Sequence, residues 1–333
     1  MPNAPRKIST LSFKSGFACL PDESFAKSMR EKVEPYVLAR QTISYFSPKP
    51  EQPLRFAGYT ADKPRDTVVI SHGFTETLEK YDEAVYYLLN RGYSVFICEH
   101  RGHGLSYREI ENYSLAHISC FGDYVEDFLL FIERVVRPNT VGRLLLLAHS
   151  MGGAIGVLAM ERQPELFFKA VLLSPMFGVN LPAPKPITYA MASIMCSVGR
   201  EEACVIGQKP FSGKKDFSAS ACASKAHFDY MFDKYLKNQY MQGCAASYSW
   251  LRESLRATGE LMKSEALSQI KTPVLVFSGT MDEVVSKPAH RRFVKAVESA
   301  ALVLVPRGGH ELFTDSASRN APVWEKIFEF FEE

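Results

Sequence analysis

One short turn, residues 148–153 (AHSMGG), constrains the fold of this chain more than any other feature. Four consecutive leucines precede it at 144–147, and apolar residues at helical spacing follow it over 154–160. This order predicts a buried strand, a sharp turn of small residues and then a helix. A serine on such a turn is strained so that its hydroxyl projects from the edge of a sheet, which is the nucleophile-elbow arrangement. Ser150 is therefore the candidate nucleophile.

Short apolar runs alternate with amphipathic segments along most of the chain. This alternation predicts an α/β fold in which helices cover both faces of a mostly parallel sheet. Residues 37–47 and 53–59, separated by a Pro-Lys-Pro sequence, are predicted to pair as an antiparallel edge. The predicted core strands are residues 67–70, 93–98, 144–147, 170–173, 273–278 and 302–305.

The alternation stops between residues 176 and 270. This stretch lacks clean strand runs and is rich in aromatic residues, and it contains methionines at positions 176, 191, 195, 231, 241 and 262. Methionine and aromatic side chains suit an adaptable apolar surface, so we predict an inserted lid over 176–270. The α/β core then comprises 37–175 and 271–333. Residues 1–36 show no compact unit and are predicted to be an N-terminal extension.

Composition excludes several classes of protein. A net charge of +2 without an arginine-rich stripe does not indicate a nucleic-acid partner. The seven cysteines include no C-x-x-C pair, so we expect reduced, mostly buried thiols and neither a disulfide framework nor a zinc site. No signal peptide or membrane-spanning run is visible, and we expect a cytoplasmic protein. No dinucleotide fingerprint or metal-ligand set is present, so no cofactor is expected.

Two later loops supply partners for Ser150. Serine hydrolysis needs a base, and an acid that orients that base, in the chain order Ser, Asp or Glu, His for this fold. Asp282 follows the 273–278 strand and His310 follows the 302–305 strand, each in a glycine-containing loop. Catalytic loops lie at these strand ends in parallel sheets. Glu283 is a rival acid, but neighbouring side chains point apart, so only one of the two reaches His310.

Two backbone amides are predicted to stabilise the developing oxyanion. The Met151 amide lies at the start of the elbow helix, where the helix dipole adds positive potential. The Phe74 amide follows Gly73 in the loop after the 67–70 strand, and the glycine permits the turn that directs this amide inward.

Five motifs together carry a resemblance to a known family. They are residues 72–74 (HGF), 100–106 (HRGHGLS), 148–153 (AHSMGG), 175–178 (PMFG) and 250–254 (WLRES). They resemble the α/β-hydrolase superfamily and, within it, the bacterial lysophospholipase and monoacylglycerol lipase branch. The likeness covers roughly residues 40–333. It implies Ser150, Asp282 and His310 as the catalytic triad, and Phe74 and Met151 as the oxyanion donors. The lid is the most divergent region, so the resemblance does not identify the headgroup of the substrate.

The favoured function is hydrolysis of a carboxylic ester with one long acyl chain through an acyl-serine intermediate. Met176, Phe177 and His149 are predicted to contact the substrate, and the aromatic stretch 228–240 is predicted to line an acyl channel. The small-molecule lipid ester is the expected partner. Peripheral contact with the inner membrane face, aided weakly by the lysines of the lid, is compatible with such a substrate.

Three alternatives remain open. A short-chain esterase would use the same scaffold and triad. A serine aminopeptidase should place carboxylates in its lid to hold the free amine, but only Glu201 and Glu202 are paired there among many lysines. A non-catalytic ligand-binding protein has no need of an intact Ser, Asp and His set, which argues against that class.

Overall fold

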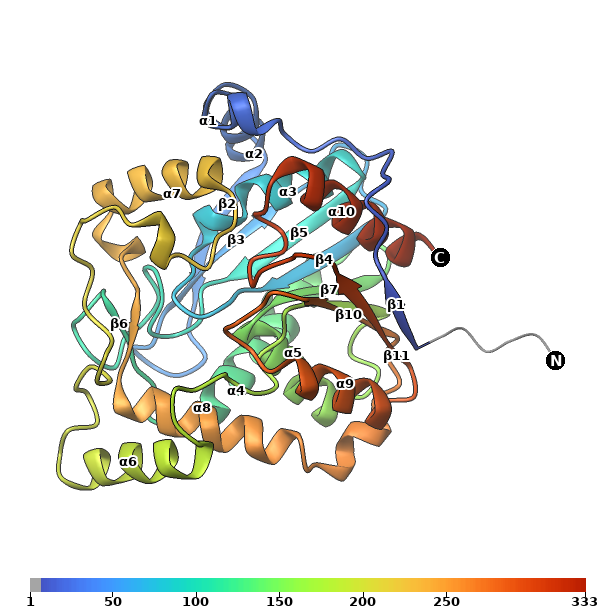
Figure 1. Cartoon of the computed structure of the whole chain (residues 1–333). Coiled ribbons are helices and arrows are strands. Elements are labelled where there is room, and N and C mark those ends of the chain that lie inside the picture. The colour runs from blue at the N-terminus through green and yellow to red at the C-terminus, as the bar shows by residue number, and fades with distance from the viewer. Residues whose placement is uncertain (1–6) are drawn as a thin grey trace.

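The computed structural model describes residues 7–333, whose strands form one nine-stranded sheet and one two-stranded sheet. The strand order in the large sheet is β1-β11-β10-β8-β7-β4-β5-β3-β2 (Figure 1). Its members are β1 Ile8–Thr10, β2 Gln41–Phe46, β3 Leu54–Tyr59, β4 Asp66–Ser71, β5 Tyr93–Cys98, β7 Leu144–His149, β8 Lys169–Leu173, β10 Val274–Gly279 and β11 Ala300–Val305. The small sheet pairs β6 Leu115–Ala116 with β9 Ala245–Ala246.

All neighbouring strands of the large sheet are parallel except at β3, which runs antiparallel to both β2 and β5. Helices occupy both faces (Figure 1). The longer ones are α3 Asp82–Asn90, α4 Gly122–Phe131, α5 Met151–Arg162, α6 Lys185–Ser197, α7 Lys225–Lys237, α8 Tyr248–Leu261, α9 Lys287–Ala296 and α10 Ala317–Glu332. The predicted mostly parallel sheet between helical layers is confirmed.

The leucine run of β7 shows why the core strands are apolar at every position. Leu145 and Leu147 pack into the cluster formed with α3 and α10. Leu146 and Ala148 pack into the opposite cluster, formed with α4, α5, α8 and α9. Successive side chains of a strand point to opposite faces, so a strand covered on both sides loses the alternation of polar and apolar residues.

The antiparallel edge is confirmed, with one difference at its start. Gln41 lies opposite Tyr59 and Phe46 opposite Leu54 in the β2–β3 register. Val37, predicted to begin this strand, instead lies in helix α2 Glu34–Leu38. Pro35 lies at the start of that helix, directly after the π-helical turn Met29–Val33.

Residues 1–36 were predicted to hold no compact unit, and the part that the structure describes differs. β1 adds a parallel edge strand beside β11. Farther along, Phe25, Met29, Val33 and Val37 are all buried against the cluster of α3 and α10. Their spacing of four residues is the sequence signal for this helical segment, because side chains four apart share one helix face.

Residues 176–270, predicted to be an inserted lid, contribute helices to two separate surroundings. α6 packs along α8, and α8 buries Leu251, Leu255 and Leu261 in the same cluster as α4 and α5. α7 packs instead against α1 Phe25–Ser28. Figure 1 shows α7 and α6 at opposite ends of this side of the molecule. No helix within residues 7–333 is long and apolar enough to cross a membrane.

Candidate active site

The turn after β7 holds Ser150 in a strained conformation, with φ 49° and ψ −115°. Its small neighbours are sterically required. A Cβ atom added to Gly152 would lie 2.0 Å from the Ser71 carbonyl oxygen, and one on Gly153 would lie 2.6 Å from Pro175 Cβ. The Ser150 amide donates to the Leu173 carbonyl at 3.0 Å, which ties the turn to the end of β8. Strain of this kind persists only where the surroundings over-determine it.

Ser150, His310 and Asp282 form one hydrogen-bonded chain. His310 Nε2 lies 3.0 Å from Ser150 Oγ, and His310 Nδ1 lies 2.9 Å from Asp282 Oδ2. The other carboxylate oxygen of Asp282 accepts from the amides of Val284 and Val285 at 2.8 and 3.1 Å. With an acidic partner on Nδ1, the ring keeps its proton there, and Nε2 is free to accept the serine proton.

The electrostatics keep Asp282 ionised. Burial raises its pKa, but the hydrogen bond and charge of His310 and the two loop amides outweigh burial, so the pKa lies below its ordinary value. Glu283 is exposed to solvent, whereas Asp282 is buried. Of the two rival acids, only Asp282 is brought to His310.

Three strands position these side chains at one edge of the sheet. Ser150 follows β7, Asp282 follows β10, and His310 follows β11. The loops after β10 and β11 approach each other closely, since a Cβ atom at Gly279 would lie 2.2 Å from the Gly309 carbonyl oxygen. The carboxyl ends of parallel strands share one edge, which brings together residues distant in sequence.

Two backbone amides beside Ser150 have no hydrogen-bond acceptor among residues 7–333: those of Phe74 and Met151. Buried amides are almost always paired, so two free ones next to a strained serine are notable. The Phe74 ring packs on Trp250, with 4.1 Å between ring centroids. Gly73 is required at this position, because an added Cβ would lie 2.8 Å from His149 Nδ1.

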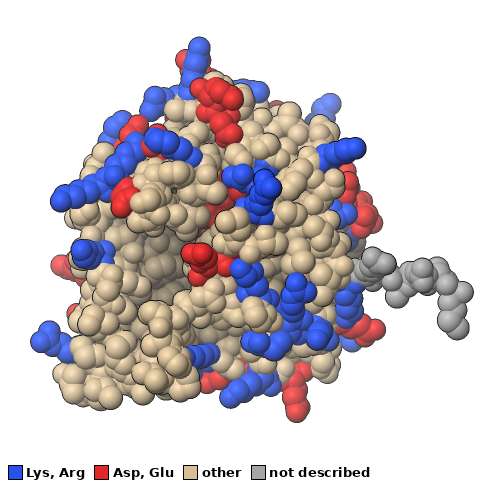
Figure 2. Space-filling view, in the orientation of Figure 1, with Lys and Arg blue, Asp and Glu red and all other residues tan. Residues whose placement is uncertain are grey.

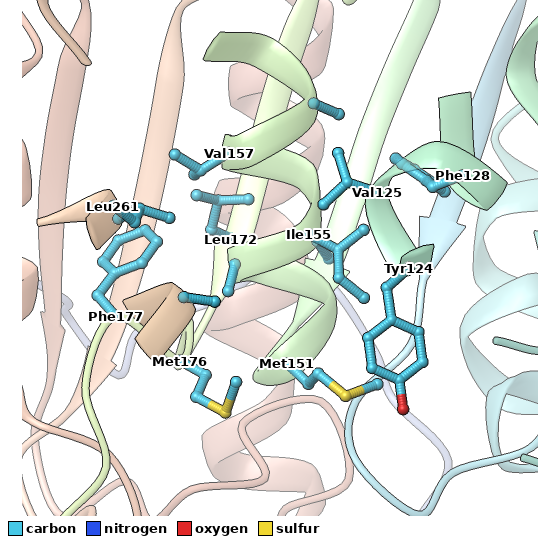
Figure 3. Packing of buried hydrophobic residues seen from close by; sticks show 14 of the residues in the cluster. Tyr124, Val125, Phe128, Met151, Ile155, Val157, Leu172, Met176, Phe177 and Leu261 are labelled. Atoms are coloured by element: carbon cyan, nitrogen blue, oxygen red, sulfur yellow. The ribbon is translucent and has the colours of Figure 1, made fainter. Parts of the chain in front are cut away.

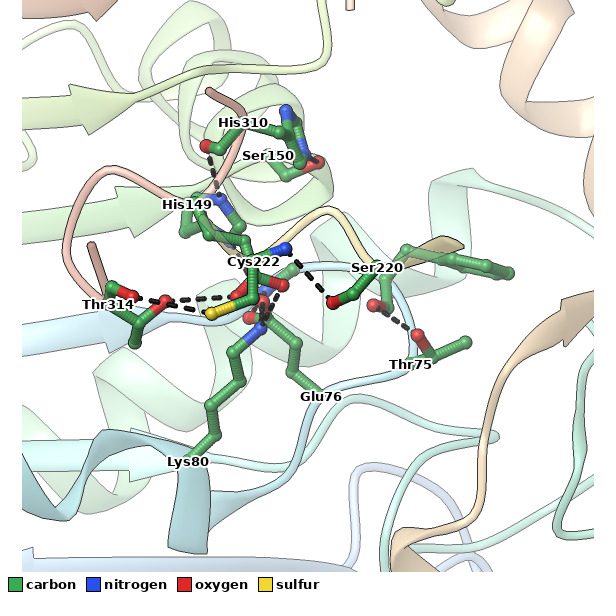
Figure 4. Close-up of polar contacts among 12 residues, drawn as sticks. Thr75, Glu76, Lys80, His149, Ser150, Ser220, Cys222, His310 and Thr314 are labelled. Carbon is green, nitrogen blue, oxygen red and sulfur yellow. Dashed lines mark hydrogen bonds and ion pairs between the residues drawn. The ribbon is translucent and has the colours of Figure 1, made fainter. Parts of the chain in front are cut away.

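His149 was predicted to contact the substrate, and that contact stays a prediction. Its Nδ1 bonds Glu76 Oε1 at 2.9 Å, and its Nε2 lies 3.4 Å from the His310 carbonyl oxygen. Figure 4 shows the ring between the Ser150–His310 pair and the Glu76 carboxylate. Both ring nitrogens therefore face protein groups, and the ring supports the loops that carry the triad.

A buried ionic cluster, which sequence reasoning missed, links the loop of Phe74 to the loop of His310 (Figure 4). Lys80 Nζ lies 2.8 Å from Glu76 Oε1 and 2.7 Å from Glu311 Oε1. The second oxygen of Glu76 accepts from the Gly73 amide at 2.5 Å and from the Tyr81 hydroxyl at 2.6 Å. Glu76 lies in the loop before the short 3-10 helix Leu78–Tyr81 that carries Lys80, so helical periodicity in the sequence does not predict this pair.

Charge balance in this cluster is visible in its pKa values. Burial raises the pKa of Glu76, but Lys80 and His149 outweigh it, and the pKa lies well below its ordinary value. Burial likewise lowers the pKa of Lys80, but the negative charges of Glu311 and Glu76 outweigh it, and the pKa lies well above its ordinary value. Depressed carboxyl pKa values stabilise the fold at neutral pH, and this stabilisation is lost as pH falls through the folded-state pKa values.

Lys80→Met is expected to lower the free energy of unfolding at pH 7 by about 3–5 kcal/mol, because it leaves two buried carboxylates without a cation. Protonating those carboxylates relieves the loss, so the deficit should shrink as pH falls from 7 toward 5. Urea unfolding of both proteins at the two pH values measures this. Lys326→Met, which removes an exposed lysine of α10, is the matched control. A deficit independent of pH would contradict the ionic account.

Met176 and Phe177 were predicted to contact the substrate, and they have different surroundings. The Met176 amide donates to the Ser150 carbonyl at 2.8 Å, and Figure 3 shows its side chain near Met151 at the start of α5. Phe177 is turned into the core and stacks on Phe293, with 4.4 Å between centroids. Consecutive side chains point in different directions, so the neighbouring Met176 and Phe177 side chains have different partners.

The stretch 228–240 was predicted to line an acyl channel, but much of it packs elsewhere. Tyr230 lies edge-on to Phe25 and its hydroxyl donates to Glu34, both in the N-terminal segment. Phe232 packs on Phe211 and Phe228 within the insertion. These aromatic residues fill the insertion's own core and its junction with the N-terminal segment.

The cysteines differ from the prediction in their burial. All seven cysteines are free, and only Cys98 and Cys222 are buried, so the expectation of mostly buried thiols was wrong. Within residues 7–333 no group of three or more His, Cys, Asp or Glu side chains is placed to hold a metal ion.

Comparison with protein families gives one match that covers most of the chain. The model of the family described as serine aminopeptidase, S33, matches residues 62–317. Lysophospholipase L2 of Escherichia coli K12 is 28% identical over 287 residues, which cover 84% of each chain. A monoglyceride lipase homolog of monkeypox virus is 29% identical over 221 residues, 66% of this chain and 72% of that protein.

Solved structures share the fold. A soluble variant of monoglyceride lipase from Saccharomyces cerevisiae matches with a TM-score of 0.68 at 16% identity, over 88% of this chain and 96% of that one. A thermostable carboxyl esterase from Bacillus coagulans matches with a TM-score of 0.70 at 15% identity, over 88% and 98%.

Proposed function

The chain belongs to the serine aminopeptidase S33 family of α/β-hydrolases, and from that membership we propose that it hydrolyses the ester of lipids with a single acyl chain. The substrate class is a lysophospholipid or a monoacylglycerol. The observation that carries the proposal is the hydrogen-bonded chain from Ser150 through His310 to Asp282, beside two free amides. The relatives named as lysophospholipases and monoglyceride lipases support the same substrate class.

The proposed reaction proceeds in two steps. Ser150 Oγ attacks the ester carbonyl while His310 Nε2 accepts the serine proton, and Asp282 stabilises the resulting imidazolium. The amides of Phe74 and Met151 donate to the oxygen that becomes negative in the tetrahedral intermediate. His310 then protonates the leaving alcohol, and water releases the acyl group from the serine in the second step.

Apolar side chains around Ser150 support a long acyl chain. Met151 follows the serine, the Met176 amide donates to the Ser150 carbonyl, and partly buried apolar residues after β8 and on α6 border the same cluster. They are Val179, Leu181, Met191 and Met195. The face drawn in Figure 2 is hollowed between α7 and α6. We infer that the acyl chain follows these residues, in place of the aromatic stretch of α7.

Chain-length dependence tests the substrate class. Each buried methylene contributes up to about 0.8 kcal/mol, so kcat/KM should rise by several orders of magnitude at most between four-carbon and ten-carbon esters. The measurement uses esters with the same leaving alcohol, below their micelle threshold. Met176→Trp should flatten the dependence while preserving activity on the four-carbon ester. A flat or falling dependence in the parent protein would favour the short-chain esterase alternative.

The aminopeptidase alternative needs carboxylates beside Ser150 to hold a free amine. The ionised carboxylates nearest the triad, Glu76 and Glu311, are already paired with Lys80. Glu201 and Glu202 lie in the turn after α6, and Glu202 is exposed to solvent. These positions favour an ester over an aminoacyl amide, and hydrolysis of aminoacyl amides at a rate similar to that of lipid esters would reverse this choice.

We further infer that α6 contacts the membrane surface that holds the substrate. Ile187 and Ile194 lie on one face of α6, and Val198 follows its last residue; the three are 62%, 62% and 63% exposed. Figure 2 shows little charge over this helix, at the lower left. The lid lysines contribute less than expected, since Lys215 and Lys225 pair with Asp229. Apolar area on an amphipathic helix drives interfacial binding.

Ile194→Glu is expected to weaken binding to phospholipid vesicles by about tenfold or more, because an isoleucine no longer enters the interface. Co-sedimentation with vesicles measures the partition coefficient. Leu236→Glu, at an exposed apolar position on α7, is the matched control and should change binding little. Equal losses in the two variants would argue against α6 as the contact.

A further inference from the structure

Arg108 lies between β5 and β6 and borders a polar hollow of about 550 Å³. Its Nη1 donates to the Gly102 carbonyl at 2.7 Å and to the Asn112 carbonyl at 3.4 Å. The Tyr113 ring lies 4.7 Å from the guanidinium carbon. These contacts fix the position of the guanidinium group without neutralising its charge. Gln239, Gln242 and segment 106–114 supply the rest of the polar lining.

The charge of Arg108 is unbalanced within the protein. No carboxylate among residues 7–333 lies within 4.0 Å of its nitrogens. The two other arginines of this region differ: Arg55 lies 3.2 Å from Glu99, and Arg101 lies 2.6 Å from Asp127. Burial lowers the pKa of Arg108 and outweighs the nearby Tyr113, Tyr124 and Glu99, which raise it. Burial also opposes the charge of Arg55 and Arg101, but their carboxylate partners outweigh it and hold both pKa values above the ordinary value. A partly buried charge without a paired counter-ion is costly.

Donors of Arg108 remain available. Its Nη2 donates no hydrogen bond in the described part of the chain, whereas its Nε, which also has no partner there, is covered by protein. Glu111 also borders the hollow, but this exposed side chain stays beyond ion-pair distance. An arginine fork with free donors matches the oxygen atoms of phosphate better than any neutral ligand does.

The hollow lies next to the loop that carries the proposed oxyanion donor. Arg108 also borders a small cavity lined by Thr75 and by Gly102, His103 and Gly104. The His103 ring lies 6.3 Å from the Phe74 ring. In a lysophospholipid, the glycerol backbone separates the phosphate from the ester, so a phosphate site displaced from Ser150 along this loop suits that substrate.

We propose that Arg108 and the hollow form a phosphate-binding site that holds the headgroup of a lysophospholipid during hydrolysis. The headgroup assignment rests on the proposed function, whereas the anion site itself stands on the unpaired guanidinium and its hollow. The site would distinguish lysophospholipids from monoacylglycerols, which lack a phosphate.

Kinetics on matched lipids test this proposal. We expect Arg108→Gln to raise KM for lysophosphatidylglycerol by about tenfold to a hundredfold, in line with the loss of charge-assisted hydrogen bonds. KM for the monoacylglycerol with the same acyl chain should change less than about twofold. Arg108→Lys retains the charge and should recover part of the difference. Arg292→Gln, which removes an exposed arginine of α9, controls for net charge.

Binding of inorganic phosphate is a second test, which does not depend on lipid hydrolysis. Phosphate should raise the Tm of the parent protein and compete with lysophosphatidylglycerol, and Arg108→Gln should lose both effects. Phosphate binding without any change in lysophospholipid KM would overturn the headgroup assignment in favour of a free anion. If Arg108→Gln raises KM equally for both lipids and the parent protein does not bind phosphate, the proposed anion site is wrong. If the parent protein hydrolyses neither lipid, the proposed function is wrong. The effect of phosphate on the Tm of the parent protein and of Arg108→Gln still shows whether the anion site exists.

Discussion

Replacing Ser150 with alanine is expected to abolish labelling by a fluorophosphonate probe and to lower kcat by roughly 10⁴–10⁶-fold. The hydroxyl is the only group of the strained turn placed 3.0 Å from His310 Nε2, so its removal leaves the base without a nucleophile. The free amides of Phe74 and Met151 remain, and they account for the residual rate. Gel fluorescence and ester hydrolysis give the two readouts.

Ser174→Ala is the matched control for this experiment. Ser174 is another buried serine at a strand end, follows β8 and also has a positive φ of 43°. Its hydroxyl has no hydrogen-bond partner within residues 7–333, so its loss should leave labelling intact. Labelling that survives Ser150→Ala, or is lost in Ser174→Ala, would assign the nucleophile elsewhere.

Asp282→Asn is expected to lower kcat by about 10⁴-fold with little change in KM. The amide can donate to His310 Nδ1, which favours the tautomer that carries its proton on Nε2 and cannot accept the serine proton. The variant should also lose the acid's stabilising charge opposite the imidazolium. Steady-state kinetics on a soluble ester measure the effect, and circular dichroism checks that the protein is folded.

Glu283→Gln separates the two neighbouring acids. Glu283 is exposed, whereas Asp282 is buried and bonded to His310 at 2.9 Å. The Glu283 substitution should therefore change kcat less than about threefold, within the range of surface substitutions. A large effect at Glu283 together with a small one at Asp282 would reverse the assignment of the acid.

The proposed site depends on more than the three side chains. Glu76, Lys80 and Glu311 join the loop of Phe74 to the loop of His310 through buried contacts of 2.8 and 2.7 Å. These ionic contacts are desolvated, so they hold the loops in one geometry more firmly than surface pairs would. Preorganised donors lose no energy to reorganisation during reaction, which is why such support matters for the oxyanion amides.

Several local features were predictable because they depend on short-range rules. The run 144–147 and the glycines after Ser150 specify a strand, a tight turn and a helix, and the structure contains β7, the strained serine and α5 in that order. The positions of Asp282 and His310 were predictable because each residue lies in the loop after a core strand. Parallel strands all end at one edge, so chain order alone brings loops together. The catalytic roles of these residues remain predictions until the substitutions are made.

Other features were not predictable from local patterns. Phe177 adjoins Met176 in sequence but stacks on Phe293, and the tyrosine of α7 at position 230 meets Phe25. Composition marks such residues as apolar without saying which apolar surface they cover. The partner segments lie more than a hundred residues away, and one-dimensional spacing carries no information about such contacts.

The sequence by itself determined the strand–turn–helix around Ser150, the parallel sheet and the order of the candidate triad, because backbone sterics and apolar periodicity act over a few residues. Only the tertiary structure decided that His149 bonds to Glu76, and that Lys80 joins the loops of Glu76 and Glu311. It alone also decided that Arg108 has no carboxylate partner among residues 7–333. Charges are balanced in space, between side chains that folding brings together, and a sequence records their number but not their distances.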